Sequence, residues 1–175
     1  MDAIKKTDYT SMEEFEKMDK DNRYSYELID GLVMMSPRPS ITHQLLSKRL
    51  AFAIDQYLVD CESLQDAELQ LDNNILVPDI MVVCDDHDLE AQRITIPPLL
   101  VVEILSPSTM SHDYIYKLNA YKRLDIAEYW IVDPKGKSII VHCFAADKTT
   151  TYYHEDMLTS CVYEELQISL KDIFR

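Results

Sequence analysis

The chain has 175 residues, of which 47% are hydrophobic and 27% charged, as in a soluble globular protein. Its formal net charge of −14 opposes non-specific attraction to a polyphosphate such as DNA. No apolar run is long enough to cross a bilayer and no signal peptide opens the chain, so we expect one cytoplasmic domain over residues 1–175.

The first sixty residues predict a helix, a hairpin and a longer helix. Ser11 and Glu14 have the spacing of a capping box, which starts a short helix within 10–20, packed on the domain. Asp30-Gly31 is a strong hairpin turn signal between two alternating segments. Ser40 can cap a helix whose apolar residues recur at helical spacing. The elements expected here are strands over 24–29 and 32–35 and a helix over 41–59.

Beyond residue 60 the pattern mixes strands with two helices. The most apolar segment, 99–105, is β-branched and bounded by prolines, which is typical of a strand buried on both faces. Other strands are predicted over 68–71, 79–83, 128–133, 138–144 and 150–153, and helices over 110–124 and 170–174. This order indicates an α/β (α+β) fold with a mixed meander of strands.

Glu103 is the strongest chemical anomaly of the sequence. It lies inside the apolar strand, where a carboxylate costs several kcal/mol unless it is paired or bound to a metal. Asp79 starts the apolar strand before it, so neighbouring strands could bring the two carboxylates together. Two hard oxygen ligands suit Mg²⁺ or Mn²⁺. The alternative is a structural Glu103 that accepts a backbone hydrogen bond or pairs with Lys117.

Lys117 admits two interpretations, whereas Glu27 has one default. Lys117 lies four residues after Asp113, which suits a surface ion pair worth about 0.2–0.5 kcal/mol. Turned inward, its ammonium could position or activate an attacking water, with Tyr121 as a buttress one turn further on. Glu27 lies in a strand beside the hairpin turn, where an outward, solvated side chain is the default. His43 is expected to be no more than a polar group in the first turn of its helix.

Other chemistry has weak support. The cysteines lie far apart without a CxxC pair, so we expect reduced thiols, neither disulfides nor zinc ligands: Cys61, Cys84, Cys143 and Cys161. There is no Walker-type loop, GxGxxG or serine-hydrolase elbow. Five basic residues fall in two short clusters that could form a local basic strip: Lys48, Arg49, Lys117, Lys122 and Arg123.

Several strings together resemble the Uma-type (Uma-two) family of bacterial proteins classed with restriction endonucleases. The most specific are Glu103-Ile104-Leu105-Ser106-Pro107-Ser108-Thr109 and Glu128-Tyr129-Trp130-Ile131-Val132-Asp133-Pro134. Weaker matches are Tyr26 to Gly31, Met35-Ser36-Pro37, His43-Gln44, Val77-Pro78-Asp79-Ile80, and Asp113, Lys117 and Tyr121 at the family's helix spacing. The resemblance runs from about residue 10 to the C-terminus.

The resemblance implies a restriction-endonuclease-like fold of the PD-(D/E)XK superfamily, with a central mixed β-sheet flanked by helices. In that superfamily two acidic residues on adjacent strands bind a divalent metal, and here they correspond to Asp79 and Glu103. Leu105 stands where the lysine usually follows, so Lys117 on the next helix is the natural candidate. Glu27 looks like the additional N-terminal acid. The family usually has a glycine before Glu128, where this chain reads Leu124 to Ala127.

The sequence therefore predicts metal-dependent hydrolysis of phosphodiester bonds, with DNA as the substrate. Asp79 and Glu103 would hold the Mg²⁺ or Mn²⁺, and Lys117 and Glu27 would complete the catalytic set. The alternative is a non-catalytic module that kept the nuclease fold for binding or assembly, which the net charge favours. An accessory protein of a transposon or toxin system is a third option. A homodimer would follow from the need to cut two strands.

Overall fold

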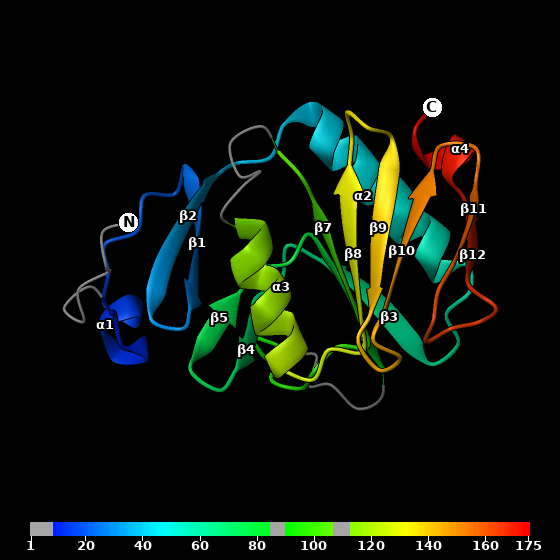
Figure 1. Ribbon diagram of the computed structural model, residues 1–175. Coiled ribbons are helices and arrows are strands. Elements are labelled where there is room, and N and C mark those ends of the chain that lie inside the picture. The colour runs from blue at the N-terminus through cyan, green and yellow to red at the C-terminus, as the bar shows by residue number, and fades with distance from the viewer. Residues whose placement is uncertain (1–8, 85–89, 107–112) are drawn as a thin grey trace.

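A six-stranded mixed sheet forms the centre of the computed structural model, which describes residues 9–84, 90–106 and 113–175 (Figure 1). Its strand order is β10-β9-β8-β7-β6-β3, with β7 and β8 parallel and the other neighbours antiparallel. The predicted central mixed sheet is confirmed. Its strands are β3 (Cys61–Gln65), β6 (Ile80–Cys84), β7 (Leu100–Ile104), β8 (Glu128–Asp133), β9 (Ser138–Cys143) and β10 (Lys148–Tyr153).

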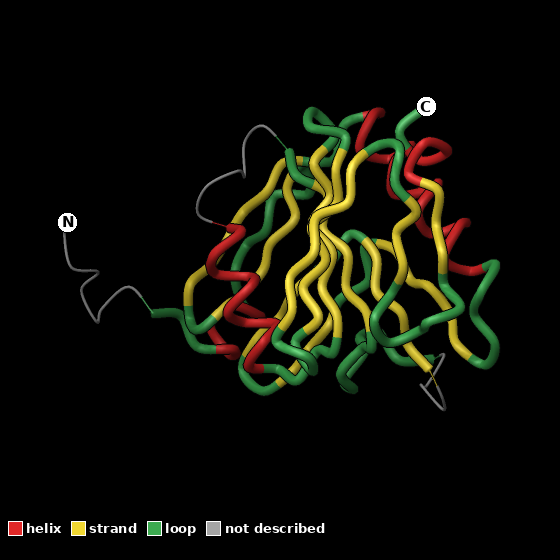
Figure 2. The backbone as a smooth tube through the Cα atoms, turned by 45° about the vertical axis from the view of Figure 1, so that its right-hand side comes forward, coloured by secondary structure: helices red, strands yellow, loops and turns green. Residues whose placement is uncertain are grey.

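Two helices cover opposite faces of this sheet, as Figure 2 shows from the side. The buried face of α2 (Ile41–Asp55) packs against the even-numbered positions of β7, Leu100 and Val102. The opposite face packs against α3 (Asp113–Arg123) through Val101. Side chains alternate across a strand, so Glu103 projects toward α3. The start predicted for this helix, 110–112, lies outside the described residues.

A smaller four-stranded sheet, in the order β2-β1-β5-β4, flanks the central one. Its strands are β1 (Tyr24–Ile29), β2 (Leu32–Pro37), β4 (Leu69–Leu71) and β5 (Asn74–Leu76). The short α1 (Met12–Glu16) begins at the predicted capping box and buries Phe15 against Leu28 and Ile75. At the C-terminal end β11 (Met157–Thr159) pairs with β12 (Gln167–Ser169), followed by α4 (Leu170–Ile173).

Two predicted helices are shorter than expected. The α1 helix covers 12–16 of the predicted 10–20. Lys17 is its C-cap, and Met18 N closes a tighter turn onto Phe15 O there. The α2 helix ends at Asp55 and not at residue 59. There Tyr57 N closes a tight turn onto Ile54 O, and Asp60 takes a left-handed φ of 64° that leads the chain into β3.

Aspartates take the place of glycine in the turns of this chain, which has two glycines. Among the described residues, six aspartates have positive φ: Asp30, Asp60, Asp66, Asp72, Asp125 and Asp147. Asp tolerates the left-handed region because its short side chain can hydrogen-bond to the local backbone. The Asp30-Gly31 turn, with φ of 52° and 79°, has the positive values that a tight hairpin requires, so the predicted hairpin is confirmed.

The expectation of four reduced thiols is wrong. The register of β3 and β6 sets Cys61 directly opposite Cys84, and the two form a disulfide. Cys143, at the end of β9, forms a second disulfide with Cys161. The first pairing was missed because β3, with its polar sequence CESLQ, was not predicted as a strand. Both bridges join segments about twenty residues apart, with separations of 23 and 18.

None of the helices in the three described ranges is long and apolar enough to span a membrane.

Candidate functional site

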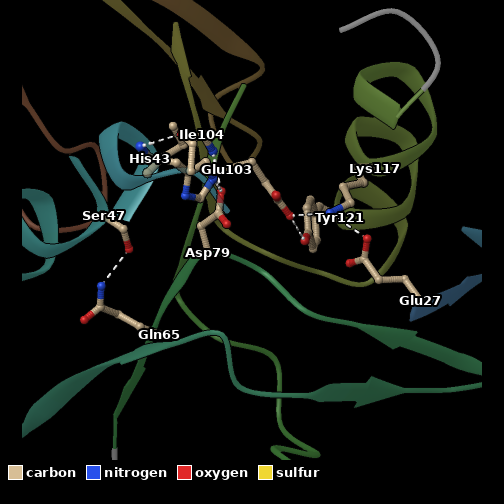
Figure 3. Close-up of polar contacts among 10 residues, drawn as sticks. Glu27, His43, Ser47, Gln65, Asp79, Glu103, Ile104, Lys117 and Tyr121 are labelled. Atoms are coloured by element: carbon tan, nitrogen blue, oxygen red, sulfur yellow. Dashed lines mark hydrogen bonds and ion pairs between the residues drawn. The ribbon is translucent and has the colours of Figure 1, made fainter. Parts of the chain in front are cut away.

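A cavity of about 260 Å³ lies where the two sheets meet the first turn of α2 and the inner face of α3. The four site residues proposed from the sequence all line it, each from a different element. Glu27 comes from β1, Asp79 from the residue before β6, Glu103 from β7 and Lys117 from α3 (Figure 3). The fold thus brings together side chains that lie up to ninety residues apart in the chain.

Strand pairing explains why Asp79 and Glu103 meet. In the antiparallel β6–β7 pair Ile80 lies opposite Val102, so one further step of the same register places Asp79 opposite Glu103. Directly opposed residues point to the same face of a sheet. The Oδ2 atom of Asp79 accepts a hydrogen bond from Ile104 N at 2.6 Å. Its Oδ1 accepts none from the described residues.

Lys117 lies between two buried carboxylates. Its Nζ is 2.8 Å from Glu27 Oε2 and 2.9 Å from Glu103 Oε1. Tyr121, one turn further along α3, donates from its hydroxyl to the same Glu103 oxygen at 2.7 Å. Val77 N donates to the other oxygen of Glu27 at 2.7 Å. Lys117 therefore points inward, as in the second of its two interpretations. The Glu103–Lys117 pair is also the one expected if Glu103 were purely structural.

Glu27 is buried, with 4% of its surface exposed, so the expected outward, solvated side chain is wrong. The expectation rested on a two-residue alternation beside an exposed turn. It failed because α3 and the residue that follows β5 enclose the side chain: Glu27 contacts Lys117 of α3 and the backbone N–H of Val77.

Burial acts on the pKa values of both Glu103 and Lys117, with different results. Desolvation raises the pKa of Glu103 to about 8, against the opposing effect of the Lys117 charge. Burial also acts to lower the pKa of Lys117, but the charges of Glu103 and Glu27 outweigh it and hold that pKa well above its usual value. Lys117 is therefore a fixed cation at neutral pH and cannot serve as a general base.

The sequence interpretation missed His43 as a part of this site. Its Nε2 lies 3.1 Å from Asp79 Oδ2, and both side chains are 14% exposed. A signal was present, because His43 stands at helical spacing from the buried residues Leu46, Ser47 and Leu50 of α2. Burial lowers the pKa of His43, but the hydrogen bond and charge of Asp79, with Asp66 and Glu103 further away, together raise it.

Asp66, which follows β3, and Arg38, which follows β2, also line the cavity. Desolvation and the charge of Asp79 raise the pKa of Asp66. Arg38 donates through Nε and one terminal nitrogen to Asn22 O. Neither had a motif in the sequence that pointed to the site.

The donor set fits a hard divalent cation. Asp79 Oδ1 and Glu103 Oε2 accept no hydrogen bond from the residues in the described ranges, so both oxygens are available to a ligand. In the same ranges no cluster of three or more His, Cys, Asp and Glu side chains could hold a metal by itself. Two carboxylates completed by waters and substrate phosphate are the usual environment of Mg²⁺.

The two basic clusters do not form a strip of free cations. Lys122 lies 3.2 Å from Asp147, and Arg123 pairs with Asp30. Arg49 donates to the backbone carbonyls of Ile173 and Arg175. Lys117 is buried between Glu27 and Glu103, so four of the five side chains make contacts within the protein, and Lys48 is exposed.

Comparisons with known proteins agree with this fold. The sequence model of the Uma2 family, described as "Putative restriction endonuclease", matches residues 12–171. The "Uncharacterized protein slr1290" of Synechocystis sp. (strain ATCC 27184 / PCC 6803 / Kazusa) is 34% identical over 116 residues, which are 63% of this chain and 61% of that protein. The matched part thus spans less than two thirds of that relative's length.

A solved structure has a similar fold over nearly the whole chain. It is the crystal structure of "a putative nuclease belonging to DUF820 from Anabaena variabilis ATCC 29413", with a TM-score of 0.80 and 20% sequence identity. The match covers 94% of this chain and 97% of the other. At this identity the likeness establishes a common fold.

Proposed function

The chain belongs to the Uma2 family and has a restriction-endonuclease-like fold, and from this premise we propose that it is a metal-dependent nuclease that hydrolyses DNA phosphodiester bonds. Asp79 and Glu103 would hold Mg²⁺ or Mn²⁺, and Lys117 and Glu27 would complete the catalytic set. The observation that carries the proposal is the register that opposes Asp79 to Glu103 in one cavity with Lys117.

The roles of the side chains follow from their contacts. When bound, the cation supplies Lewis-acid chemistry: it neutralises charge on the scissile phosphate and lowers the pKa of a coordinated water. Lys117 keeps its charge, so it would stabilise the negative charge that develops on the phosphate and orient the nucleophile. Glu27 holds Lys117 in place from the side opposite Glu103. Water would attack phosphorus and form a new P–O bond while the P–O bond to the leaving sugar oxygen breaks. The proton that the water loses would pass to solvent, and the leaving oxygen would take up a proton from solvent, so that the step is a net addition of water.

The charge of the cavity suggests an order of binding. Four acidic side chains line it, those of Glu27, Asp66, Asp79 and Glu103, together with Arg38, Lys117 and His43, and Glu103 holds a proton below about pH 8 in the metal-free site. A divalent cation that displaces this proton would add positive charge and make the cavity more attractive to a phosphate. Binding of the metal would therefore precede productive binding of DNA.

The alternative is a non-catalytic module with the same fold. The net charge of −14 and the engagement of the basic clusters in contacts within the protein favour it, because neither helps the chain to hold a nucleic acid. The cavity favours the enzyme, because Asp79 and Glu103 each keep one oxygen that accepts no hydrogen bond from the described residues and line a space with Lys117.

Calorimetry with Mg²⁺ and Mn²⁺, followed by a plasmid-nicking assay, tests the proposal. We expect wild type to bind the cation and cleave DNA, and Asp79→Ala and Glu103→Ala to lose both. Glu165→Ala, which removes an exposed carboxylate away from the cavity, is the matched control. A wild type that neither binds metal nor cuts plasmid or oligonucleotide DNA would contradict the nuclease and favour the module.

A homodimer is proposed on the same functional ground, since the cleavage of two strands calls for two sites. Sedimentation velocity of the wild type, with and without a duplex oligonucleotide, tests it, and a monomer under both conditions would refute it.

A further inference from the structure

We propose that His43 is a positioning residue for Asp79, which fixes the orientation of that carboxylate so that Oδ1 remains available to the divalent cation. The inference rests on the proposed function, because it assigns Asp79 to the metal. It concerns a side chain in the first turn of α2, which packs on the other face of the sheet from Lys117 and Glu103 (Figure 3).

The geometry places two donors on one oxygen. Asp79 Oδ2 accepts from Ile104 N at 2.6 Å and lies 3.1 Å from His43 Nε2. A carboxylate that accepts one hydrogen bond can still rotate about the Cβ–Cγ bond of the aspartate. Two donors from different elements restrict this rotation to one orientation. The backbone donor comes from β7 and the imidazole from α2, so Asp79 is held from both sides and Oδ1 keeps its accepting capacity for the cavity.

The imidazole is itself well anchored. His43 N donates to the cap residue Ser40 at 3.3 Å, and the following turns of α2 bury Leu46, Leu50 and Ile54 in the core. Its ring is 14% exposed, as is Asp79. The imidazole that donates to Asp79 is thus held in place by the packing of α2, unlike a mobile side chain on the surface.

The second ring nitrogen supports a dedicated role. His43 Nδ1 is buried and has no hydrogen-bond partner among the residues that the structure describes. A buried polar atom without a partner costs free energy, and the structure keeps the imidazole in place despite this cost at Nδ1. The hydrogen bond that the ring makes within the described residues is the one from Nε2 to Asp79. Nε2 donates to that carboxylate whether the ring is neutral or cationic, so the role does not depend on the charge of His43.

Three substitutions separate positioning from mere packing. Gln at position 43 has an amide nitrogen that reaches about as far as Nε2, Asn carries the same group one methylene shorter, and Ala has none. We expect His43→Gln to bind Mn²⁺ within about threefold of wild type. His43→Asn and His43→Ala should bind it at least tenfold more weakly, in the range typical of residues that orient metal ligands. Gln44→Ala, an exposed position in the same turn, is the control.

Calorimetry and crystal structures of the metal-free variants together decide the outcome. We expect one Asp79 orientation in wild type and His43→Gln, and a rotated or split Asp79 carboxylate in His43→Asn and His43→Ala. An unchanged Asp79 orientation and Mn²⁺ affinity in His43→Ala would overturn the inference while the metal site stood. If wild type binds no metal, the proposed function fails, and the orientation of Asp79 in the variants still decides the role of His43. A fall in melting temperature shared equally by Gln, Asn and Ala, without a difference in Asp79, would mean packing alone.

Discussion

At the scale of single residues, two buried glutamates have opposite roles. Glu103 lies in the cavity with one oxygen free for a ligand. Glu128, from the other family-specific string, has no exposed surface and accepts from Trp130 Nε1, Ser160 Oγ and the backbone N–H groups of Cys161 and Val162. A carboxylate satisfied by four donors holds a loop and needs no cation. The second string therefore contributes to the fold, and the first contains the carboxylate that we propose to bind the metal.

Glu128→Ala should destabilise the fold without touching the cavity. The change leaves several buried donors unsatisfied, each costing about 1–3 kcal/mol, so we expect the free energy of unfolding to fall by roughly 3 kcal/mol or more. Urea denaturation followed by circular dichroism measures it. The exposed Glu164→Ala serves as the control and should stay within about 0.5 kcal/mol of wild type. A Glu128→Ala variant as stable as wild type would contradict this account of the loop.

Binding of Mg²⁺ should release a proton from Glu103. Burial raises the pKa of this carboxyl to about 8, so below that pH the metal-free site holds a proton that must leave before the carboxylate can coordinate. The sign follows: affinity rises as the pH increases toward 8 and levels off above it. Calorimetry at pH 7 in two buffers of different ionisation enthalpy counts the protons. We expect close to one for wild type; a count of zero would mean that Glu103 is already ionised.

At the scale of elements, the strongly apolar strands could be predicted from the sequence, whereas the polar strand β3 could not. Predicted strand 128–133 has the bounds of β8, because its residues are buried along nearly its whole length. The edge strand β3 has a mixed pattern and gains its structure from pairing with β6, which no local signal reveals. Because β3 was not predicted, the disulfide between Cys61 and Cys84 was not predicted either.

The candidate site shows the same division. Asp79 and Glu103 could be paired from the order of two apolar strands, since adjacency of consecutive strands is the commonest arrangement. His43 could not, because its partner lies 36 residues away on an element that meets α2 only in the tertiary structure. Burial of Glu27 likewise depends on α3 and on Val77 after β5, which a two-residue alternation does not encode.

The end of α3 explains the one departure from the family pattern and gives a prediction. Asp125 takes a φ of 58° just after the helix, and Ile126 N donates back to Tyr121 O, as in a Schellman cap where glycine is usual. Asp125→Gly should therefore stabilise the protein by about 0.5–1 kcal/mol, because glycine adopts this conformation without strain. Asp125→Ala should destabilise it by a similar amount. Thermal melts of the pair test this, and equal melting temperatures would contradict it.

At the scale of the whole molecule, the distribution of charge determines how strongly the protein surface can attract DNA. The chain carries 17 basic and 31 acidic residues, and Lys122, Arg123 and Lys117 are already paired with carboxylates. Phosphate contacts from lysine and arginine normally supply most of the affinity for a duplex. The exposed Lys48, Lys135, Lys137 and Lys148 are outnumbered by acidic residues, so under the proposed function the cation in the cavity would carry much of the attraction.

DNA binding should consequently depend on the divalent cation more than on the surface. We expect fluorescence anisotropy with a labelled duplex to show little binding in EDTA at about 0.1 M salt, and binding in Mn²⁺ that Asp79→Ala abolishes. Cleavage during the measurement is followed on a gel, and a phosphorothioate duplex slows it. Because few phosphates would be neutralised by side chains, affinity in Mn²⁺ should also fall only weakly with salt. Tight, steeply salt-dependent binding in EDTA would instead place the nucleic acid on a surface away from the cavity, and would make the chain a binding module on the nuclease fold.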